Sequence, residues 1–198
     1  MSRPNFKILY LCRGGHVSGA QRQLLYLLKG LDRSRFTPLV LCTEGGPFLD
    51  DVRNMQVSCA HWKFAHWRKL KSLLARYRDV AHLTRLVQSE GVSLIHCSDF
   101  QFGQYMFRSA RNAGLPSIMH VRAPIDRRTA RKYACSKATA IVAISRRVEL
   151  RLAQQACLPR DKITLIHDAV DPDLFKPRDP GPNGSILRRQ YHAGNTVL

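Results

Sequence analysis

The residues best placed to do chemistry follow the first apolar run of the chain. Residues 12–31 read CRGGHVSGAQRQLLYLLKGL, with Gly14, Gly15 and Gly19 ahead of a leucine-rich segment. Glycines at a turn into a helix let a ligand approach the backbone, and the first amides of the helix and its dipole attract anions. This loop therefore predicts a site for a phosphate or another anion.

The spacing of this loop does not fit two common nucleotide-binding motifs. Gly14 and Gly19 have the G-x-x-x-x-G spacing of a P-loop, but Ala20 and Gln21 stand where that motif needs a lysine and a hydroxyl. The dinucleotide fingerprint G-x-G-x-x-G fails as well, because His16 stands where its second glycine belongs. A P-loop ATPase is disfavoured, NAD binding has little support, and we expect neither a cofactor nor a metal.

Residues 18–21, SGAQ, have the S-x-x-Q form of a capping box. Ser18 is expected to accept a hydrogen bond from a first-turn amide, while Gln21 reaches back to the start of the helix. One interpretation is that this is only a helix cap. The functional interpretation adds that Gly19 exposes backbone, so that the amides of Gly19 and Ala20 receive an anion. Both interpretations can hold together.

Short apolar runs alternate with segments of helical period along most of the chain. The apolar runs are residues 6–12, 37–42, 57–62, 92–98, 117–122, 139–145 and 162–167. The helical segments are residues 19–31, 62–87, 104–113, 127–137 and 148–157. This alternation predicts an α/β protein with a Rossmann-like, doubly wound, mostly parallel sheet and helices on both faces. In such sheets the ligand crevice lies at the carboxyl ends of the strands.

The composition changes after residue 170, where prolines and glycines become frequent. We expect residues 1–170 to form one Rossmann-like domain. Residues 171–198 are expected to form a Pro/Gly-rich linker and the truncated start of a second domain, with a helical piece at 186–191 and the first residues of a strand at 195–198.

Charge narrows the range of partners. Lys and Arg number 32 against 14 Asp and Glu, for a formal charge of +18. The expected partner is an anion, which could be nucleic acid, a phosphorylated substrate or an acidic lipid head group. Six scattered cysteines with no C-x-x-C pair, and no apolar run long enough to span a bilayer, favour a reduced, cytoplasmic protein.

Several stretches resemble one family. SGAQRQLLYLLKGL looks like the G-G-x-[EQ] loop and first helix of retaining glycosyltransferases of GT-B fold, in particular glycosyltransferase family 4. Residues 140–177, AIVAISRRVELRLAQQACLPRDKITLIHDAVDPDLFKP, are similar to the segment that ends the family's N-terminal domain. SLIHCSD and GLPSIMHVRAP resemble two strands in between, so the resemblance covers nearly the whole chain. The chain differs from the family pattern at Ser18 and Ala169, where the family usually has glycine.

The resemblance implies an activity and a division of labour. It implies transfer of a sugar from a nucleotide-diphosphate sugar to a saccharide or lipid-linked acceptor, with retained anomeric configuration, in a cleft between two Rossmann-like domains. The N-terminal half shapes the acceptor site, and the C-terminal half holds the nucleotide and carries an E-x7-E motif. No two of Glu44, Glu90 and Glu149 have that spacing. We therefore expect the donor half to be absent and this chain alone to be inactive.

The resemblance also points to site residues. Counting six residues from Pro116 to the family's active-site histidine gives Arg122, and His120 lies two positions earlier on the same face of a strand. Either could take that catalytic role, although His120 could also be an ordinary core histidine. Asp99 could orient a hydroxyl or be a solvated loop carboxylate. Ser145, at the end of a strand, is expected to cap a helix at the crevice.

The segment 62–87 predicts a long basic amphipathic helix with aromatic residues near its start. Such a helix could lie on an anionic membrane, peripherally at the inner face, or could simply cover the sheet. A basic nucleic-acid-binding module is an alternative function, but no known motif supports it and we expect no specific nucleic acid. A nucleotide-dependent oxidoreductase or epimerase is a further alternative that lacks its fingerprint.

Overall fold

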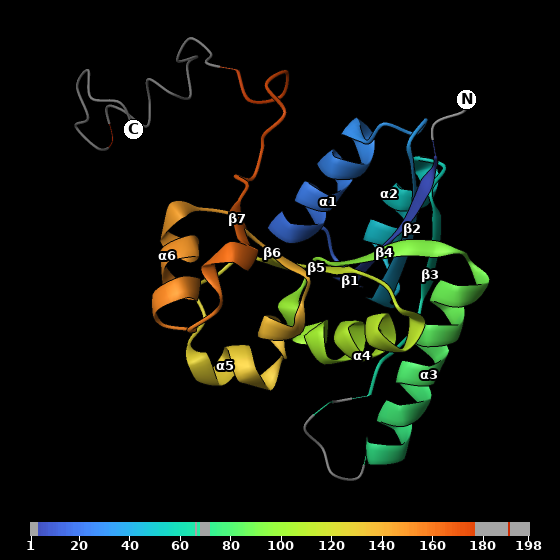
Figure 1. The fold of residues 1–198 in the computed structure, drawn as a ribbon. Helices are drawn as coiled ribbons and strands as arrows, with labels where there is room; N and C mark the ends of the chain where they lie inside the picture. The colour runs from blue at the N-terminus through green and yellow to red at the C-terminus, as the bar shows by residue number, and fades with distance from the viewer. Residues whose placement is uncertain (1–3, 66, 68–71, 177–189, 191–198) are drawn as a thin grey trace.

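The described part of the chain forms one twisted parallel sheet. The computed structural model describes residues 4–65, 67, 72–176 and 190. Seven strands pair in the order β3-β2-β1-β4-β5-β6-β7, and every pair is parallel (Figure 1). Their bounds are β1 Phe6–Gly14, β2 Phe36–Glu44, β3 Ser58–His61, β4 Val92–Cys97, β5 Ser117–Val121, β6 Ala140–Ala143 and β7 Ile163–Leu165. The predicted Rossmann-like, doubly wound class is confirmed.

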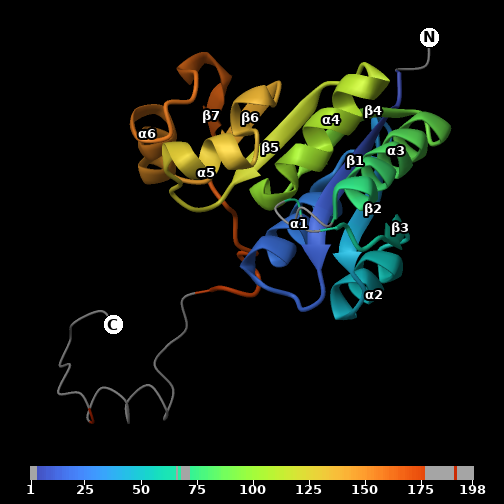
Figure 2. The same ribbon diagram turned by 90° about the horizontal axis from the view of Figure 1, so that it is seen from below.

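Helices cover both faces of this sheet. On one face lie α1 Gly19–Gly30 and α2 Pro47–Asn54, and on the other lie α3 Leu73–Ser89, α4 Gly103–Ala113, α5 Arg127–Lys132 and α6 Arg146–Gln154 (Figures 1 and 2). Short 3-10 turns, η2 Phe100–Phe102, η3 Cys135–Lys137 and η4 Arg160–Lys162, link several of them. The chain adds β2 and β3 on one side of β1 and then β4 to β7 on the other side. The helices change face at the same point, between β3 and β4.

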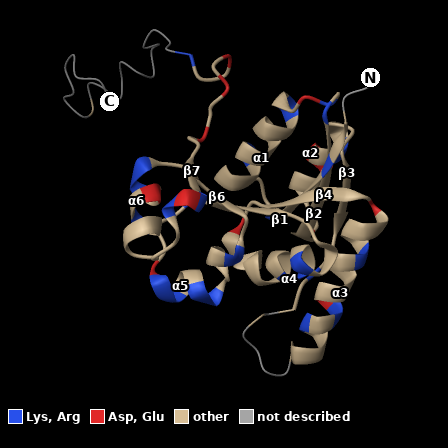
Figure 3. Cartoon of the chain, in the orientation of Figure 1, with Lys and Arg blue, Asp and Glu red and all other residues tan. Residues whose placement is uncertain are grey.

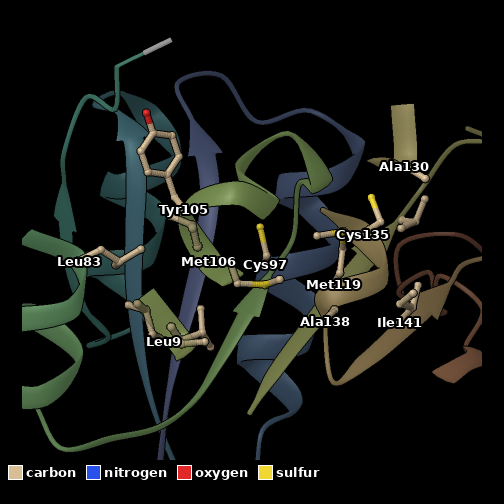
Figure 4. Close-up of a cluster of buried hydrophobic side chains, with 14 of the residues drawn as sticks. Leu9, Leu83, Cys97, Tyr105, Met106, Met119, Ala130, Cys135, Ala138 and Ile141 are labelled. Carbon is tan, nitrogen blue, oxygen red and sulfur yellow. The ribbon is translucent and has the colours of Figure 1, made fainter. Parts of the chain in front are cut away.

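Successive apolar side chains along a strand contribute alternately to two separate hydrophobic cores. In β1, Leu9 and Leu11 join the larger core under α3 to α6, whereas Ile8 and Tyr10 join the core under α1 and α2. Successive strand residues point to opposite faces, so one run of apolar residues fills both. Figure 4 shows the larger core, in which Met106 of α4 lies beside residues of β1, β4 and β5.

Two glycines are required by close approach of backbone. Gly14 has φ +82°, and a Cβ there would collide with the carbonyl oxygen of Glu44 and lie 2.8 Å from Cβ of Cys42. Gly103 begins α4, where a Cβ would collide with the carbonyl oxygen of Tyr133 and lie 2.6 Å from Cε of Met119. Both positions hold turns against the carboxyl-terminal edge of the sheet, which is where a ligand is expected.

The helix predicted over residues 62–87 is wrong in its first part. The helix α3 begins at Leu73, and residues 62–65 are neither helix nor strand. The fully buried carboxylate of Asp79 accepts hydrogen bonds from the indole of Trp62 (3.2 Å) and the amide of Ala65 (2.7 Å). These bonds hold an extended segment against the helix, so tertiary contacts override the helical period of the sequence.

Two further elements differ from the prediction. The helix α2 was not predicted, because its Gly-Gly-Pro start resembles a loop, although proline is favourable in a first helical turn. The helix predicted over 127–137 ends at Lys132, and Ala134 then has φ +54°. The helical piece predicted at 186–191 and the strand at 195–198 lie outside the described residues, apart from residue 190.

Candidate functional site

The predicted site residues follow different strands that end at one edge of the sheet. The loop after β1 leads into α1, Asp99 follows β4, Arg122 follows β5 and Ser145 follows β6. Because all the described strands are parallel, these positions meet at the carboxyl-terminal edge. Side-chain contacts then divide them into separate groups.

The capping box predicted at the start of α1 does not form. Ser18 is the N-cap residue, but in the described structure its side chain accepts no hydrogen bond from a first-turn amide. Its hydroxyl instead donates to Oε1 of the buried Gln21. Gln21 packs inward and bonds to the side chain of Ser18, whereas the amide of Ser18 donates to the carbonyl of His16 at 3.1 Å. A Cβ added to Gly19 would meet nothing within 4 Å among the described atoms, so the helix start is open at that residue.

Two histidines and an arginine lie together on the α1 side of the sheet. The rings of His96 in β4 and His120 in β5 are stacked, with centroids 5.6 Å apart. Within the described chain, Nε2 of both histidines and Nε of Arg122 are buried and have no hydrogen-bond partner. Buried polar atoms without partners are rare, so they mark a place where a ligand or ordered water would be stabilised.

The electrostatics of this cluster keep both imidazoles neutral. Burial lowers the pKa of His96 to about 3, with smaller contributions from His120 and Arg122. Burial, and then the positive charge of Arg122, lowers the pKa of His120 to about 4. A neutral imidazole has one donor and one acceptor nitrogen. The pair can therefore bind hydroxyl groups at neutral pH without adding positive charge.

A cavity of about 490 Å³ joins this cluster to α1 and to the segment that follows β7. His96, His120 and Arg122 form the sheet side of the cavity, and residues 166–169 form its rim. Both His120 and Arg122 line the cavity, in agreement with their spacing on the strand. His96 was not singled out from the sequence, although a histidine in a strand that is otherwise largely apolar was a usable signal.

Hydrogen bonds hold the segment after β7, residues 166–169, against α1 and the end of β5. Nη1 of Arg122 donates to Oδ1 of Asp168 at 2.5 Å. The side-chain amide of Gln23 donates to the carbonyl of Ala169 (2.6 Å) and accepts from its amide (3.0 Å). These partners are 46 and 146 residues apart in sequence, and no local pattern could have revealed them.

Asp99 and Ser145 are not part of the histidine cavity. Asp99 accepts from the amide of Gln101 at 3.3 Å, and its Oδ2 lies 4.0 Å from Nε of Arg13. Arg13 and Gln101 line a second cavity, of about 420 Å³. Ser145 caps α6 as predicted, since its hydroxyl accepts from the amide of Val148 at 3.3 Å.

The described residues contain neither a metal-binding cluster nor a membrane-spanning helix. No group of three or more His, Cys, Asp or Glu side chains that could hold a metal ion occurs among them. No helix within the described ranges has the length and apolar character needed to cross a membrane.

The fold is that of an N-terminal domain of GT-B glycosyltransferases, and three solved structures are similar to it. Anabaena HepE in complex with UDP and glucose is 20% identical, with a TM-score of 0.70 over 96% of this chain and 51% of that one. A glycosyltransferase from Rickettsia africae is 16% identical, with a TM-score of 0.73 over 98% and 51%. Acinetobacter baumannii MurG is 14% identical, with a TM-score of 0.61 over 89% and 47%. This chain thus spans about half the length of these proteins.

The family follows from a sequence model. The model of Glycosyltransferase Family 4 matches residues 17–174, and the chain belongs to that family. No curated protein sequence matches the chain significantly. The resemblance expected from the sequence is confirmed. The match extends from the loop before α1 to the segment after β7.

Proposed function

We propose that this chain is the acceptor-side, N-terminal domain of a retaining glycosyltransferase that moves a sugar from a nucleotide-diphosphate sugar to a saccharide or lipid-linked acceptor. The observation that carries this proposal is the family match over residues 17–174. The complex of the similar Anabaena protein with UDP and glucose supports a nucleotide-sugar donor. In this proposal residues 1–170 form the domain, and residues 171–198 are a linker and the beginning of a second domain.

The chemistry of the reaction assigns roles to the edge residues. As the bond to the anomeric carbon breaks, positive charge develops on the sugar and negative charge on the leaving diphosphate. The amides of Gly19 and Ala20 at the open start of α1 suit the diphosphate, because they point along the helix dipole. Ser18 and Gln21 shape that turn through their mutual hydrogen bond rather than by capping it.

The histidine cavity supplies neutral hydrogen-bonding groups for a sugar or an acceptor hydroxyl. His120 is the proposed contact, with a nitrogen that has no partner in the described chain. Arg122 is neutralised by Asp168, so it orients groups without presenting an isolated charge. Asp99 would orient an acceptor hydroxyl beside the second cavity, which its neighbour Arg13 lines. Ser145 is proposed to act only by holding α6 at the edge.

The donor half is proposed to lie outside this chain. The matched structures are about twice as long, and the expected E-x7-E motif does not occur here. The 198-residue chain should therefore release no UDP from UDP-sugars, whereas a polypeptide that also contains the second domain should. Proton NMR of the first product formed should show the anomeric configuration of the donor. Inverted product, or full activity of the 198-residue chain, would contradict the proposal.

The site roles have their own test in the longer polypeptide. His120→Ala and Arg122→Ala are expected to lower kcat/KM strongly, and Ser145→Ala only slightly. Unchanged activity in both of the first two variants would remove them from the site. A cytoplasmic location, with the acceptor in the inner face of a membrane, is the setting that this function favours.

A further inference from the structure

A groove of about 460 Å³ lies between α3 and α4, on the face of the sheet opposite α1. Its lining combines the guanidinium groups of Arg76, Arg108 and Arg111 with the rings of Trp67, Tyr77 and Phe107. It shares Trp67 with the cavity beside Asp99, but none of its arginines lines that cavity or the histidine cavity. The proposed transfer reaction does not account for this positively charged groove with aromatic walls.

Trp67 gives the groove a fixed floor. Two guanidinium groups lie near its ring, with Cζ of Arg76 at 5.4 Å and Cζ of Arg108 at 5.0 Å from the ring centroid. Tyr105 packs edge-on against the same ring at 5.0 Å. Nη1 of Arg76 also donates to the carbonyl of Trp67 at 2.6 Å. Arg76 and Arg108 are therefore held in place by contact with the ring of Trp67, and Arg76 also by a hydrogen bond.

The first turns of α3 present apolar side chains at the rim of the groove. Leu73 is 46% exposed, Leu74 is 84% exposed and Tyr77 is 68% exposed. Farther along the helix, Val80 and Leu83 are buried in the core. Residues three and four apart lie on one side of a helix, so the three exposed side chains form one projecting group. This arrangement costs free energy in water and is typical of a contact surface.

The charges of Arg108 and Arg111 are not neutralised by acidic groups of the described residues. No Asp or Glu is among the described residues that line the groove, and Arg108 and Arg111 form no ion pair within the described ranges. The acid nearest in sequence, Asp79, is fully buried and bonded to Trp62 and Ala65. Figure 3 shows basic residues on α3 and α4 in this region. The complementary partner is therefore an anion.

We propose that the groove between α3 and α4 docks the domain on an anionic phospholipid membrane. Lipid phosphates bind Arg108 and Arg111, while Leu73, Leu74 and Tyr77 enter the boundary between head groups and acyl chains. Nucleic acid would not use the exposed leucines, and the guanidinium groups of Arg76 and Arg108 already contact the ring of Trp67 on which a base would stack. The membrane-binding surface proposed here is this groove, and not a continuous helix over residues 62–87. It does not depend on the transferase activity, since docking needs no sugar donor.

Flotation of the 198-residue chain with vesicles tests the proposal. The chain should float with vesicles of phosphatidylcholine and phosphatidylglycerol, and not with phosphatidylcholine alone. The double variant Arg108→Gln/Arg111→Gln should lower the partition coefficient by about 30-fold, since each basic residue near such a surface contributes about fivefold. Leu74→Ser/Tyr77→Ser should lower it severalfold with little change in its dependence on salt.

The matched control is Arg33→Gln/Arg35→Gln, which removes the same charge from the exposed turn between α1 and β2. It should float nearly as well as the unaltered chain. An equal loss in this control would show that the chain binds vesicles only through its net positive charge, and would contradict the proposal. Equal flotation with neutral vesicles, or loss of oligonucleotide binding but not of vesicle binding in Arg108→Gln/Arg111→Gln, would also overturn the proposal. All the altered side chains are exposed, and circular dichroism checks that each variant is folded.

Discussion

Arg122 at the end of β5 donates a hydrogen bond of 2.5 Å to Asp168, which follows β7. The pair closes one end of the histidine cavity and, with the bonds between Gln23 and Ala169, fastens the segment that leaves the sheet onto α1. Residues 166–169 therefore have a defined position beside the cavity. Burial lowers the pKa of His120 and the charge of Arg122 lowers it further, so Arg122 contributes both to this contact and to keeping the imidazole neutral.

A double-mutant cycle should detect this pair. Arg122→Ala and Asp168→Ala are each expected to lower the free energy of unfolding by about 1–2 kcal/mol, with a coupling of about 1 kcal/mol. The side chains are 18% and 34% exposed, which limits screening by solvent. The exposed pair Arg53–Asp50 is the control and should couple by less than about 0.5 kcal/mol. Strictly additive losses at Arg122 and Asp168 would show that the bond contributes nothing.

The buried histidines should make the fold sensitive to acid. The pKa of His120 is about 4 when folded and about 6.5 when unfolded, so the unfolded chain binds more protons between these values. Stability is then complete above pH 6.5 and falls as the pH decreases, by about 3 kcal/mol at pH 4 from His120 alone. Denaturant unfolding at a series of pH values measures this slope. His120→Gln should reduce the slope and leave the part due to His96, whose pKa is about 3, whereas His61→Gln, at an exposed position, should not change it.

The two serine N-caps should respond differently to alanine. Ser145→Ala removes the hydroxyl that accepts from the amide of Val148 and should cost about 1 kcal/mol of stability. Ser18→Ala removes only a bond to the side chain of Gln21 and should cost less, about 0.5 kcal/mol or below. Thermal unfolding of both variants makes the comparison. Equal losses would indicate that Ser18 caps α1 in solution after all.

Alanine substitutions at two glycines test packing and ligand access separately. Gly103→Ala should destabilise the chain by about 1–3 kcal/mol, because the new methyl group meets Tyr133 and Met119. Gly19→Ala should leave stability within about 0.5 kcal/mol, since the described structure has open space there. In the longer polypeptide, Gly19→Ala should nevertheless raise the KM for the nucleotide sugar. An unchanged KM would mean that no ligand approaches the backbone at that helix start.

The sequence by itself determined the class of fold, the family and the cap at Ser145. These features depend on alternation along single strands, on helical period and on motifs within a few residues, which are local properties of the chain. His120 and Arg122 share a face for the same local reason.

Only the tertiary structure decided which of these residues meet. It placed His96 against His120, bonded Arg122 to Asp168, left Asp99 beside a different cavity and turned Ser18 toward Gln21. It also delayed the start of α3, because buried Asp79 holds residues 62–65 outside the helix. Such contacts follow from the order of the strands and from the burial of polar groups, and a one-dimensional pattern contains neither.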